Sequence, residues 1–247
     1  MLRRDLLWAL DPVRFAREAL GFHPDSSQAR VLRSNMRRLL LNCTRQWGKS
    51  TTAAALALHR AIYYSNSLIL LVSPSQRQSV ELLRKVGTFL SQLKIKPVKV
   101  EDNQFSFVLA NGSRIVALPS KEATVRGFSG VSLIIEDEAS RVDDLLYRSM
   151  RPMLAVSGGR LILMSTPFGK SGHFFEEWTE GGSSWERIEC KATDCARIPQ
   201  QFLEEERASL GEWWFRQEYL CEFVQTLDNV FSHDLVMNAI VDVEPLF

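Results

Sequence analysis

One short segment near the N-terminus restricts the possible folds of this 247-residue chain more than any other. Residues 39–61 read LLLNCTRQWGKSTTAAALALHRA, an apolar run followed by a polar turn and an alanine-rich stretch. The pattern predicts a buried strand over 39–42 and a helix that begins at the lysine and reaches residue 64. Free backbone N–H groups at such a helix start bind anions. The segment therefore predicts an α/β fold with an anion site at one sheet edge.

The turn matches half of the phosphate-loop pattern G-x-x-x-x-G-K-[ST]. Gly48, Lys49 and Ser50 fit its second half, whereas Cys43 stands in place of the first glycine. In this pattern the backbone N–H groups cradle phosphates, the lysine adds positive charge and the hydroxyl binds Mg²⁺. The alternative is a chance G-K-S at an ordinary helix start, so other segments must decide between the two.

The composition indicates one globular core with room for a small appended subdomain, since 45% of the residues are hydrophobic. No apolar run reaches the roughly 18 residues that a membrane span needs, and charges occupy the N-terminus where a signal peptide would be apolar. We therefore expect a cytosolic protein with no membrane partner. The four cysteines form no C-x-x-C pair, which argues against a zinc site and a disulfide framework.

The net charge of +1 conceals an asymmetry along the chain. Residues 1–60 contain eleven Lys and Arg against four acids, whereas residues 174–222 contain twelve acids against five basic residues. Two interpretations stay open. The charges form solvated faces, or the basic and acidic ends suit head-to-tail contact between identical subunits.

Apolar strands alternate with a helical pattern after the first strand and helix. We expect further strands at 68–72, 131–135 and 160–164, a helix at 76–93 and a hairpin over 103–118 with its turn at Asn111-Gly112. This order predicts a mostly parallel sheet with helices on both faces. After about residue 191 we expect a helical part, with aromatic side chains on one helix face at Phe215, Tyr219 and Phe223.

A second polar strand end supplies the acids that a phosphate loop needs. The segment VSLIIEDEAS at 131–140 is an apolar strand followed by three consecutive acids. We assign Asp137 to hold Mg²⁺ through water and Glu138 to polarise the attacking water, with Glu136 at the strand end. A register shifted by one position and a surface acidic turn are the alternatives. Together, the two segments favour an ATPase.

A third strand, LILMSTPFG at 161–169, delivers Ser165 and Thr166 to the same predicted edge. A hydroxyl there can sense the γ-phosphate or the catalytic water. By itself, this segment is better explained as a strand-ending turn at Pro167.

These segments together resemble the large terminase subunit of tailed double-stranded DNA bacteriophages. CTRQWGKS, IIEDEA and MSTPFG occur in this order, with FHPDSSQARVL upstream and FRQEYLCEFV downstream, so the resemblance covers nearly the whole chain. That family has an altered phosphate loop with an arginine inside it, which accounts for the missing glycine.

The resemblance implies a P-loop ATPase core of the additional-strand, conserved-glutamate class over residues 1–190, with an N-terminal helical segment. It further implies a helical lid subdomain at 191–228 and a linker at 229–247.

The resemblance also implies ligands and the residues that bind them. Expected ligands are ATP and Mg²⁺. Carried over by position, Lys49 and Ser50 bind phosphates and Mg²⁺, Asp137 is the metal-site acid and Glu138 the catalytic base. Ser165 and Thr166 couple hydrolysis to movement. Gln28 is similar to the adenine-reading glutamine, and the remaining expected ATP contacts are Arg45, Gln46, Trp47, Gly48 and Thr51.

Two arginines are candidates for transition-state stabilisation. Arg45 lies inside the loop, and Arg126 lies in ATVRGFSG, twelve residues before Glu138. We expect Arg126 to act in trans on a neighbouring subunit, because Gly127 and Gly130 suit a mobile loop. A salt bridge to a nearby acid is the alternative for Arg126, and Arg45 can serve its own site.

The resemblance implies a motor that assembles as a ring on the portal and drives double-stranded DNA into a capsid in the cytoplasm of the infected host. Implied partners are the portal protein and the small terminase subunit; the isolated chain is expected to be monomeric. Large terminases also carry a nuclease domain, for which this chain leaves no room, so we expect no nuclease activity. The alternatives are a nucleotide-gated ring-assembly module and a superfamily 2 helicase-like translocase, which would need a second motor domain.

Overall fold

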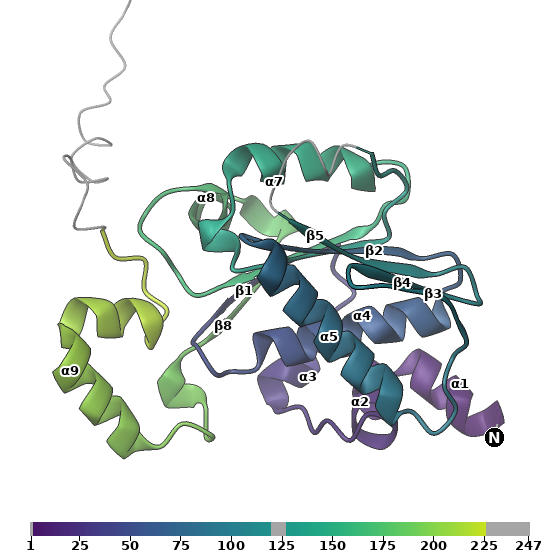
Figure 1. Ribbon diagram of the computed structural model, residues 1–247. Coiled ribbons are helices and arrows are strands. Elements are labelled where there is room, and N and C mark those ends of the chain that lie inside the picture. Colours follow the sequence, from purple (N-terminus) through teal and green to yellow (C-terminus); the bar gives the residue numbers. More distant parts are fainter. Residues whose placement is uncertain (1, 120–126, 226–247) are drawn as a thin grey trace, which may run out of the picture.

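A single mixed sheet forms the centre of the protein. The computed structural model describes residues 2–119 and 127–225, in which eight strands lie in the order β3-β4-β5-β2-β6-β7-β1-β8 (Figure 1). The strands are β1 Arg38–Cys43, β2 Leu68–Ser73, β3 Lys99–Asp102, β4 Ser106–Leu109, β5 Arg114–Pro119, β6 Leu133–Asp137, β7 Arg160–Ser165 and β8 Glu186–Cys190.

Strand direction agrees with the mostly parallel sheet expected from the sequence. The strands β5, β2, β6, β7, β1 and β8 are parallel, and β3 and β4 join antiparallel beside β5. The expected hairpin is the β4–β5 pair, and Gly112 in its turn has a φ of 80°. β7 lies between β1 and β6 and is the additional strand.

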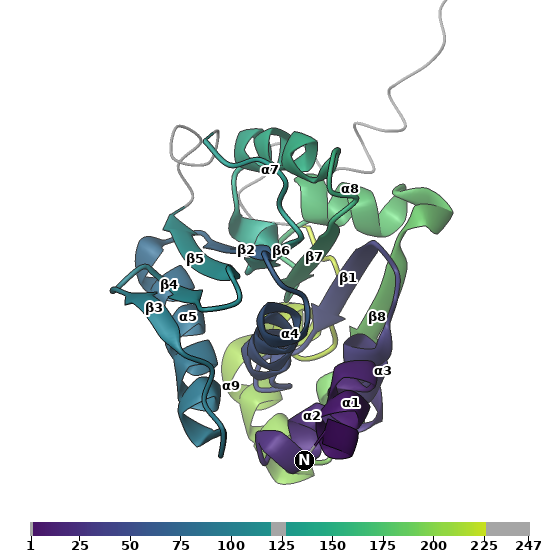
Figure 2. The ribbon, with the colours of Figure 1, turned by 90° about the vertical axis from the view of Figure 1, so that its right-hand side faces the viewer.

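Helices cover both faces of the sheet, as Figures 1 and 2 show. The first face carries α1 Leu2–Leu10, α2 Pro12–Ala19, α3 Ser26–Arg33, α4 Lys49–Tyr63 and α5 Gln76–Gln92. The second face carries α7 Asp144–Met150 and α8 His173–Thr179. α9 Gln200–Glu218 lies off the carboxyl ends of the strands, where Thr44 Oγ1 after β1 donates to the Glu218 carbonyl oxygen (Figures 1 and 2).

The two helical layers explain why the central strands are apolar throughout. Successive side chains of a strand point to opposite faces. In β2, Leu70 packs into the core under α7 and α8, whereas Leu71 packs into the core under α4 and α5. Both are fully buried. A strand covered on both faces therefore reads as a continuous apolar run.

The edge strands and one strand boundary differ from the sequence-based expectation. β3 is exposed at every position, and β8 has polar residues and only two buried ones, so neither shows an apolar run. Neither strand was predicted.

The boundary of one central strand also differs. β6 begins at Leu133, two residues later than expected, and continues through Glu136 and Asp137. The acids therefore form the last part of the strand, because hydrogen bonding to β7 persists to Asp137.

The C-terminal helical part has its own small core of Ala192, Leu203, Phe215 and Tyr219. α9 is interrupted at Gly211, whose φ of 78° lies in the left-handed region that glycine tolerates. The expectation that Phe223 shares one helix face with Phe215 and Tyr219 is wrong, because α9 ends at Glu218. Phe223 instead packs against Phe174, Phe175 and Trp178 of the sheet's second layer.

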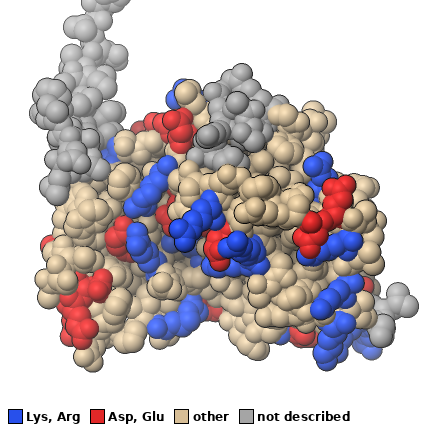
Figure 3. Space-filling model, in the orientation of Figure 1, with Lys and Arg blue, Asp and Glu red and all other residues tan. Residues whose placement is uncertain are grey.

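Part of the charge asymmetry is neutralised inside the chain. Arg30 of the basic segment pairs with Glu186 at 2.9 Å, and Arg45 pairs with Glu218 at 2.6 Å. On the face shown in Figure 3, acidic side chains gather over α9, and Lys and Arg are spread over the centre. Among the described residues, no helix combines the length and apolarity needed to cross a membrane.

The close approach of two segments at Gly159 generates a stability prediction. A Cβ at this position would collide with the carbonyl oxygen of Val131 and lie 2.8 Å from Leu154 Cδ2. We expect Gly159→Ala to lower the free energy of unfolding by about 2 kcal/mol, measured by denaturant titration. Gly87→Ala is the matched control: it lies in α5 with open space around it, so we expect a gain of about 0.5–1 kcal/mol. Equal effects would contradict the packing at Gly159.

Candidate active site

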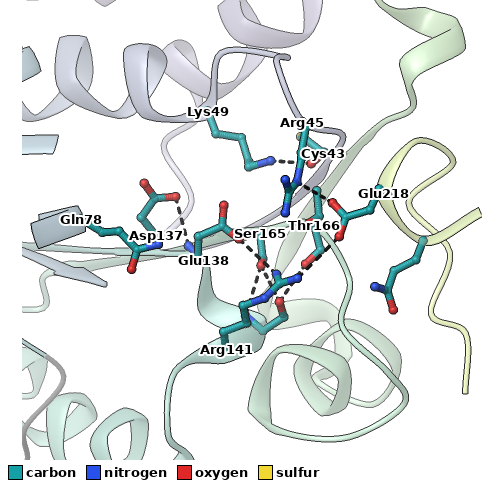
Figure 4. Close-up of polar contacts among 12 residues, drawn as sticks. Cys43, Arg45, Lys49, Gln78, Asp137, Glu138, Arg141, Ser165, Thr166 and Glu218 are labelled. Carbon is teal, nitrogen blue, oxygen red and sulfur yellow. Dashed lines mark hydrogen bonds and ion pairs between the residues drawn. The ribbon is translucent and has the colours of Figure 1, made fainter. Parts of the chain in front are cut away.

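Lys49, the first residue of α4, bonds back to the start of the loop between β1 and α4. Lys49 Nζ donates hydrogen bonds to the carbonyl oxygens of Cys43, at 2.7 Å, and Thr44, at 3.1 Å. Lys49 is buried, so its ammonium group lies within the loop (Figure 4). Gly48 has a φ of 98°, and a Cβ there would lie 2.8 Å from Gln28 Nε2. Both observations account for a glycine before the lysine.

Neighbouring segments hold the loop through the carbonyl oxygen of Trp47. This oxygen accepts hydrogen bonds from Gln28 Nε2 and from Arg197 Nη2, both at 2.7 Å. The Trp47 side chain is fully buried. Gln46 has a φ of 62°, a left-handed conformation that is strained for a residue with a Cβ. The loop is therefore fixed by packing and by long-range hydrogen bonds.

Gln28, the residue compared with an adenine-reading glutamine, lies behind the loop. It is 1% exposed, and its Oε1 accepts a hydrogen bond from the Asp25 backbone N–H, while Asp25 accepts one from the Gln28 N–H. This reciprocal pair caps α3. In this conformation the Gln28 amide supports α3 and the loop. Thr51 lies half-buried in the first turn of α4.

The two main sequence motifs meet at the ends of the strands. Ser50 Oγ donates to Asp137 Oδ2 at 3.2 Å, which joins the start of α4 to the end of β6. Burial, and secondarily the charge of Glu138, raises the pKa of Asp137 to about 6. A bound cation would offset both effects.

The donors at this contact decide which metal can bind. Among the described residues there is no group of three or more His, Cys, Asp or Glu side chains that could hold a metal. A hydroxyl–carboxylate pair fits Mg²⁺, which commonly takes one or two protein ligands, water and substrate phosphates.

Glu138 directly follows β6 in a strained backbone conformation. Its φ of 55° and ψ of 42° are left-handed, which costs about 1–3 kcal/mol for a residue other than glycine. Its backbone N–H donates to Asp137 Oδ1 at 3.0 Å. The Glu138 side chain is partly exposed and accepts from Arg141 Nη1 at 3.4 Å. The carboxylate of Glu138 is therefore held by Arg141 at the mouth of the site.

A chain of ion pairs extends from Glu138 to α9. Arg141 Nη2 lies 3.5 Å from Glu218 Oε1, and Arg45 Nε lies 2.6 Å from Glu218 Oε2. Figure 4 shows Glu218 between the two arginines. The Glu218 side chain is only 8% exposed, whereas that of Arg45 is 62% exposed. Arg141 also stacks on Phe168, with 4.5 Å from its Cζ to the ring centroid.

Neither Arg141 nor Glu218 is singled out by the sequence motifs. Arg141 follows the acidic segment without a recognised spacing, and Glu218 lies far along the chain from both arginines. One available signal was the segment FRQEYLCEFV that contributed to the resemblance, because Glu218 is the glutamate within FRQEY.

Ser165 and Thr166 connect the end of β7 to the segment after Glu138. The hydroxyls of Ser165 and Ser140 are 2.7 Å apart, and Ser140 Oγ donates to the Thr166 carbonyl oxygen at 2.8 Å. Ser165 and Thr166 are fully buried, and Thr166 Oγ1 has no hydrogen-bond partner among the described residues. The two residues thus contact the structure that carries Glu138. Arg126 lies outside the described residues, as do all residues after 225.

A buried network lies on the other face of β6. Glu136 is fully buried, and its Oε1 lies 2.7 Å from His173 Nε2. His173 Nδ1 lies 2.9 Å from Asp144 Oδ1, and the imidazole stacks on Tyr147 with ring centroids 4.3 Å apart. Because strand side chains alternate, Glu136 points away from the residue that meets Ser50. This geometry favours the Asp137-Glu138 register over one shifted by a position.

The site geometry and the strand order point to one class of protein. A lysine and a hydroxyl that begin α4 face the carboxylate at the end of β6, and one additional strand separates β1 from β6. We assign the fold to P-loop nucleoside triphosphatases of the additional-strand class.

Sequence comparison identifies the family within this class. The family described as "Terminase large subunit, T4likevirus-type, N-terminal" matches residues 40–236, and the chain belongs to this family.

Individual relatives agree with this family and fold. The large terminase subunit of Escherichia phage T5 is 26% identical over 245 residues, which cover 92% of this chain and 53% of that protein. The large terminase ATPase domain of Thermus phage P74-26 superposes with a TM-score of 0.76 at 21% identity, covering 87% of this chain and 100% of that one.

A large terminase from a thermophilic bacteriophage, solved in complex with ADP, gives a TM-score of 0.67 at 11% identity and covers 81% of this chain and 53% of that one. The chain spans about half the length of the curated relatives it matches. The family and fold expected from the sequence are confirmed, and the roles of single residues stay predictions.

The buried histidine generates a pH prediction. Its carboxylate partners outweigh burial and raise the pKa of His173 above its usual 6.5. A raised pKa stabilises the folded protein below pH 6.5, and this contribution is lost as the pH rises through the folded-state value. We expect the free energy of unfolding to fall as the pH rises above 6.5, by at most about 1.4 kcal/mol per pH unit, until the folded-state pKa of His173 is passed. Asp137 titrates below this window.

Denaturant titrations at several pH values between about 6.5 and 9 measure this slope, which we expect His173→Gln to remove. His23→Gln, at an exposed position, is the control that keeps it. A wild-type slope that persists unchanged in His173→Gln would show that another group titrates.

The ion-pair chain generates a coupling prediction. A double-mutant cycle with Glu218→Gln and Arg141→Gln should yield a coupling energy of about 1–2 kcal/mol in denaturant titrations, because Glu218 is shielded from water. The control cycle uses the exposed pair Arg216 and Glu222, which should couple by less than about 1 kcal/mol. A buried-pair cycle that is no larger than the control would mean that Arg141 and Glu218 do not interact in solution.

Proposed function

We propose that this chain is the ATPase motor of a terminase large subunit, which hydrolyses ATP to move double-stranded DNA into a procapsid. The observation that carries the proposal is the contact between Ser50 and Asp137 at 3.2 Å, which unites the phosphate-loop motif and the acidic strand end in one site. Family membership and the ADP complex of the thermophilic-phage large terminase support it.

In this function the start of α4 binds the phosphates. Lys49 would give up its hydrogen bonds to the Cys43 and Thr44 carbonyl oxygens and bind phosphate oxygens instead. Backbone N–H groups of the loop and of the helix start would contact the other phosphate oxygens. The residues proposed for these contacts are Arg45, Gln46, Trp47, Gly48, Ser50 and Thr51. Ser50 and Asp137 would hold Mg²⁺, whose charge offsets that of the phosphates. Glu138 would orient the attacking water and accept its proton.

Gln28 is proposed to read adenine, which requires its buried amide to exchange partners. An amide can pair with adenine N6 and N7. Gln28 presently bonds the Asp25 N–H and the Trp47 carbonyl oxygen. Nucleotide binding would therefore be linked to a rearrangement of the α3 cap and of the loop.

Residues outside the loop are proposed to connect hydrolysis to movement. Ser165 and Thr166 contact the segment after Glu138, and Glu218 links Arg45 and Arg141 to α9. An incoming γ-phosphate would compete with Glu218 for Arg45, because both are anionic. Residues 191–228 would act as the lid. Arg126 is proposed as the finger that completes a neighbour's site in the ring.

The remaining partners follow from the family. We propose a ring on the portal protein, delivery of DNA with the small terminase subunit, and action in the host cytoplasm, with a monomer when the chain is isolated. Nuclease activity is expected to be absent from these residues. DNA-contacting residues are not assigned.

ATP turnover tests the proposal directly. With Mg²⁺ present, we expect the rate per subunit of the purified chain to increase with protein concentration, because a neighbour completes each site. Glu138→Ala should reduce turnover by about 100-fold or more, since a general base contributes roughly 10²–10⁴. Glu101→Ala, at an exposed position of the edge strand β3, is the matched carboxylate control and should leave turnover unchanged.

Three outcomes would contradict parts of the proposal. Turnover that survives Glu138→Ala would reject Glu138 as the base. A rate per subunit that does not depend on protein concentration would reject a trans-acting Arg126 and favour Arg45 as the finger. Bound ATP without any turnover would reject the motor function for this chain.

A further inference from the structure

A cavity of about 340 Å³ lies at the opposite end of α4 from the phosphate loop. Its walls come from α1, α2, the end of α3, the last turns of α4 and the starts of β6 and β7. The cavity includes Arg60 on α4 and Arg160 at the start of β7. Arg60 lies eleven residues after Lys49 on the same helix, which places it about 16 Å from the site described above.

Both guanidinium groups have a buried nitrogen without a partner among the described residues. Arg60 Nε and Arg160 Nη2 are buried and make no hydrogen bond there. Arg60 stacks on Tyr64, with its Cζ 4.0 Å from the ring centroid. Arg160 Nε donates to the Met36 carbonyl oxygen at 3.1 Å. Buried donors are normally satisfied, and leaving one unsatisfied is unfavourable, more so when it is charged.

The acids around the cavity are already committed to other cations. Asp11 Oδ2 pairs with Arg33 Nη2 at 2.7 Å, and Glu186 Oε1 pairs with Arg30 Nε at 2.9 Å. His59 adds no charge: burial lowers its pKa, and its Nε2 bonds the Trp8 carbonyl oxygen. Within the described part of the chain, neither Arg60 nor Arg160 has an ion-pair partner. The cavity therefore carries two unmatched positive charges.

The surrounding structure explains only one of these charges. Arg60 lies in the last turn of α4, where a cation complements the helix dipole. Arg160 lies at a strand start, where no such dipole acts. Burial and the charge of Arg60 lower the pKa of Arg160, and the more distant Glu186 only partly offsets them.

We propose that this cavity is a second anion site that binds the phosphate group of a small phosphorylated molecule. A phosphate monoester carries a charge of about −1.5 to −2 at pH 7, which matches two guanidinium groups, whereas a carboxylate carries only one charge. A cavity of this size holds a phosphate together with an organic substituent. This inference is independent of the proposed motor function.

Isothermal titration of the whole chain with glycerol phosphate and with inorganic phosphate tests the proposal. We expect saturable binding that weakens tenfold or more in Arg160→Gln and in Arg60→Gln. Lys49→Ala, which disables the phosphate loop, should retain the binding that depends on Arg60 and Arg160. The control Arg84→Gln, at an exposed helical position, should bind as the wild type does. If Arg160→Gln does not fold, Arg60→Lys replaces it in the test. This variant keeps the positive charge but loses the unpaired Nε–H of Arg60, so its binding should also be weaker than that of the wild type.

Competition and stability measurements identify the ligand class. We expect phosphate to raise the melting temperature of the wild type but not that of Arg160→Gln, whose melting temperature without phosphate should not fall. Equal binding of acetate would overturn the choice of phosphate, and displacement by a short DNA duplex would assign the site to the DNA backbone instead. Absence of saturable binding, or its loss in Lys49→Ala alone, would overturn the site.

Discussion

The parallel arrangement of β6, β7 and β1 is the constraint on which the site depends. Parallel strands end at the same edge of a sheet, so the polar residues that follow each apolar run meet there. Asp137 ends β6, Ser165 ends β7, and the phosphate loop follows β1. Register with the intervening strand fixes their relative heights. The helical layers on both faces bury these strands, and the buried strands hold Asp137 and the phosphate loop on a rigid support.

Buried charges around this edge are matched, and this organises the surrounding segments. Glu218 is shielded by two arginines from different segments, and Glu136 meets a histidine whose other nitrogen faces Asp144. Removing one partner of such a pair leaves an uncompensated charge, which is much more costly than losing both. These pairs therefore tie α9, α7 and α8 to the strand ends. Their net contribution to stability is smaller than their cost of disruption.

The interior of the fold was predictable from the sequence, and its edges and long-range contacts were not. Strand 68–72 and the helix from Lys49 followed from apolar runs and from a helix start, which are local signals. β8 was missed because an edge strand needs no continuous apolar run. In the site, Ser50, Asp137 and Glu138 were found through motif spacing. Glu218 has no signal beyond the FRQEY segment of the resemblance, because its neighbours are set by the path of α9.

The carbonyl oxygen of Trp47 has a consequence for how the loop can move. One atom accepts hydrogen bonds from Gln28, in the N-terminal helical segment, and from Arg197, just before α9. A rotation of this single peptide plane breaks both bonds together. The N-terminal helical segment and the C-terminal part thus share one acceptor on the loop. A loop rearrangement breaks both of these hydrogen bonds in one event, while the ion pair between Arg197 and Asp25 at 3.0 Å still joins the two parts directly.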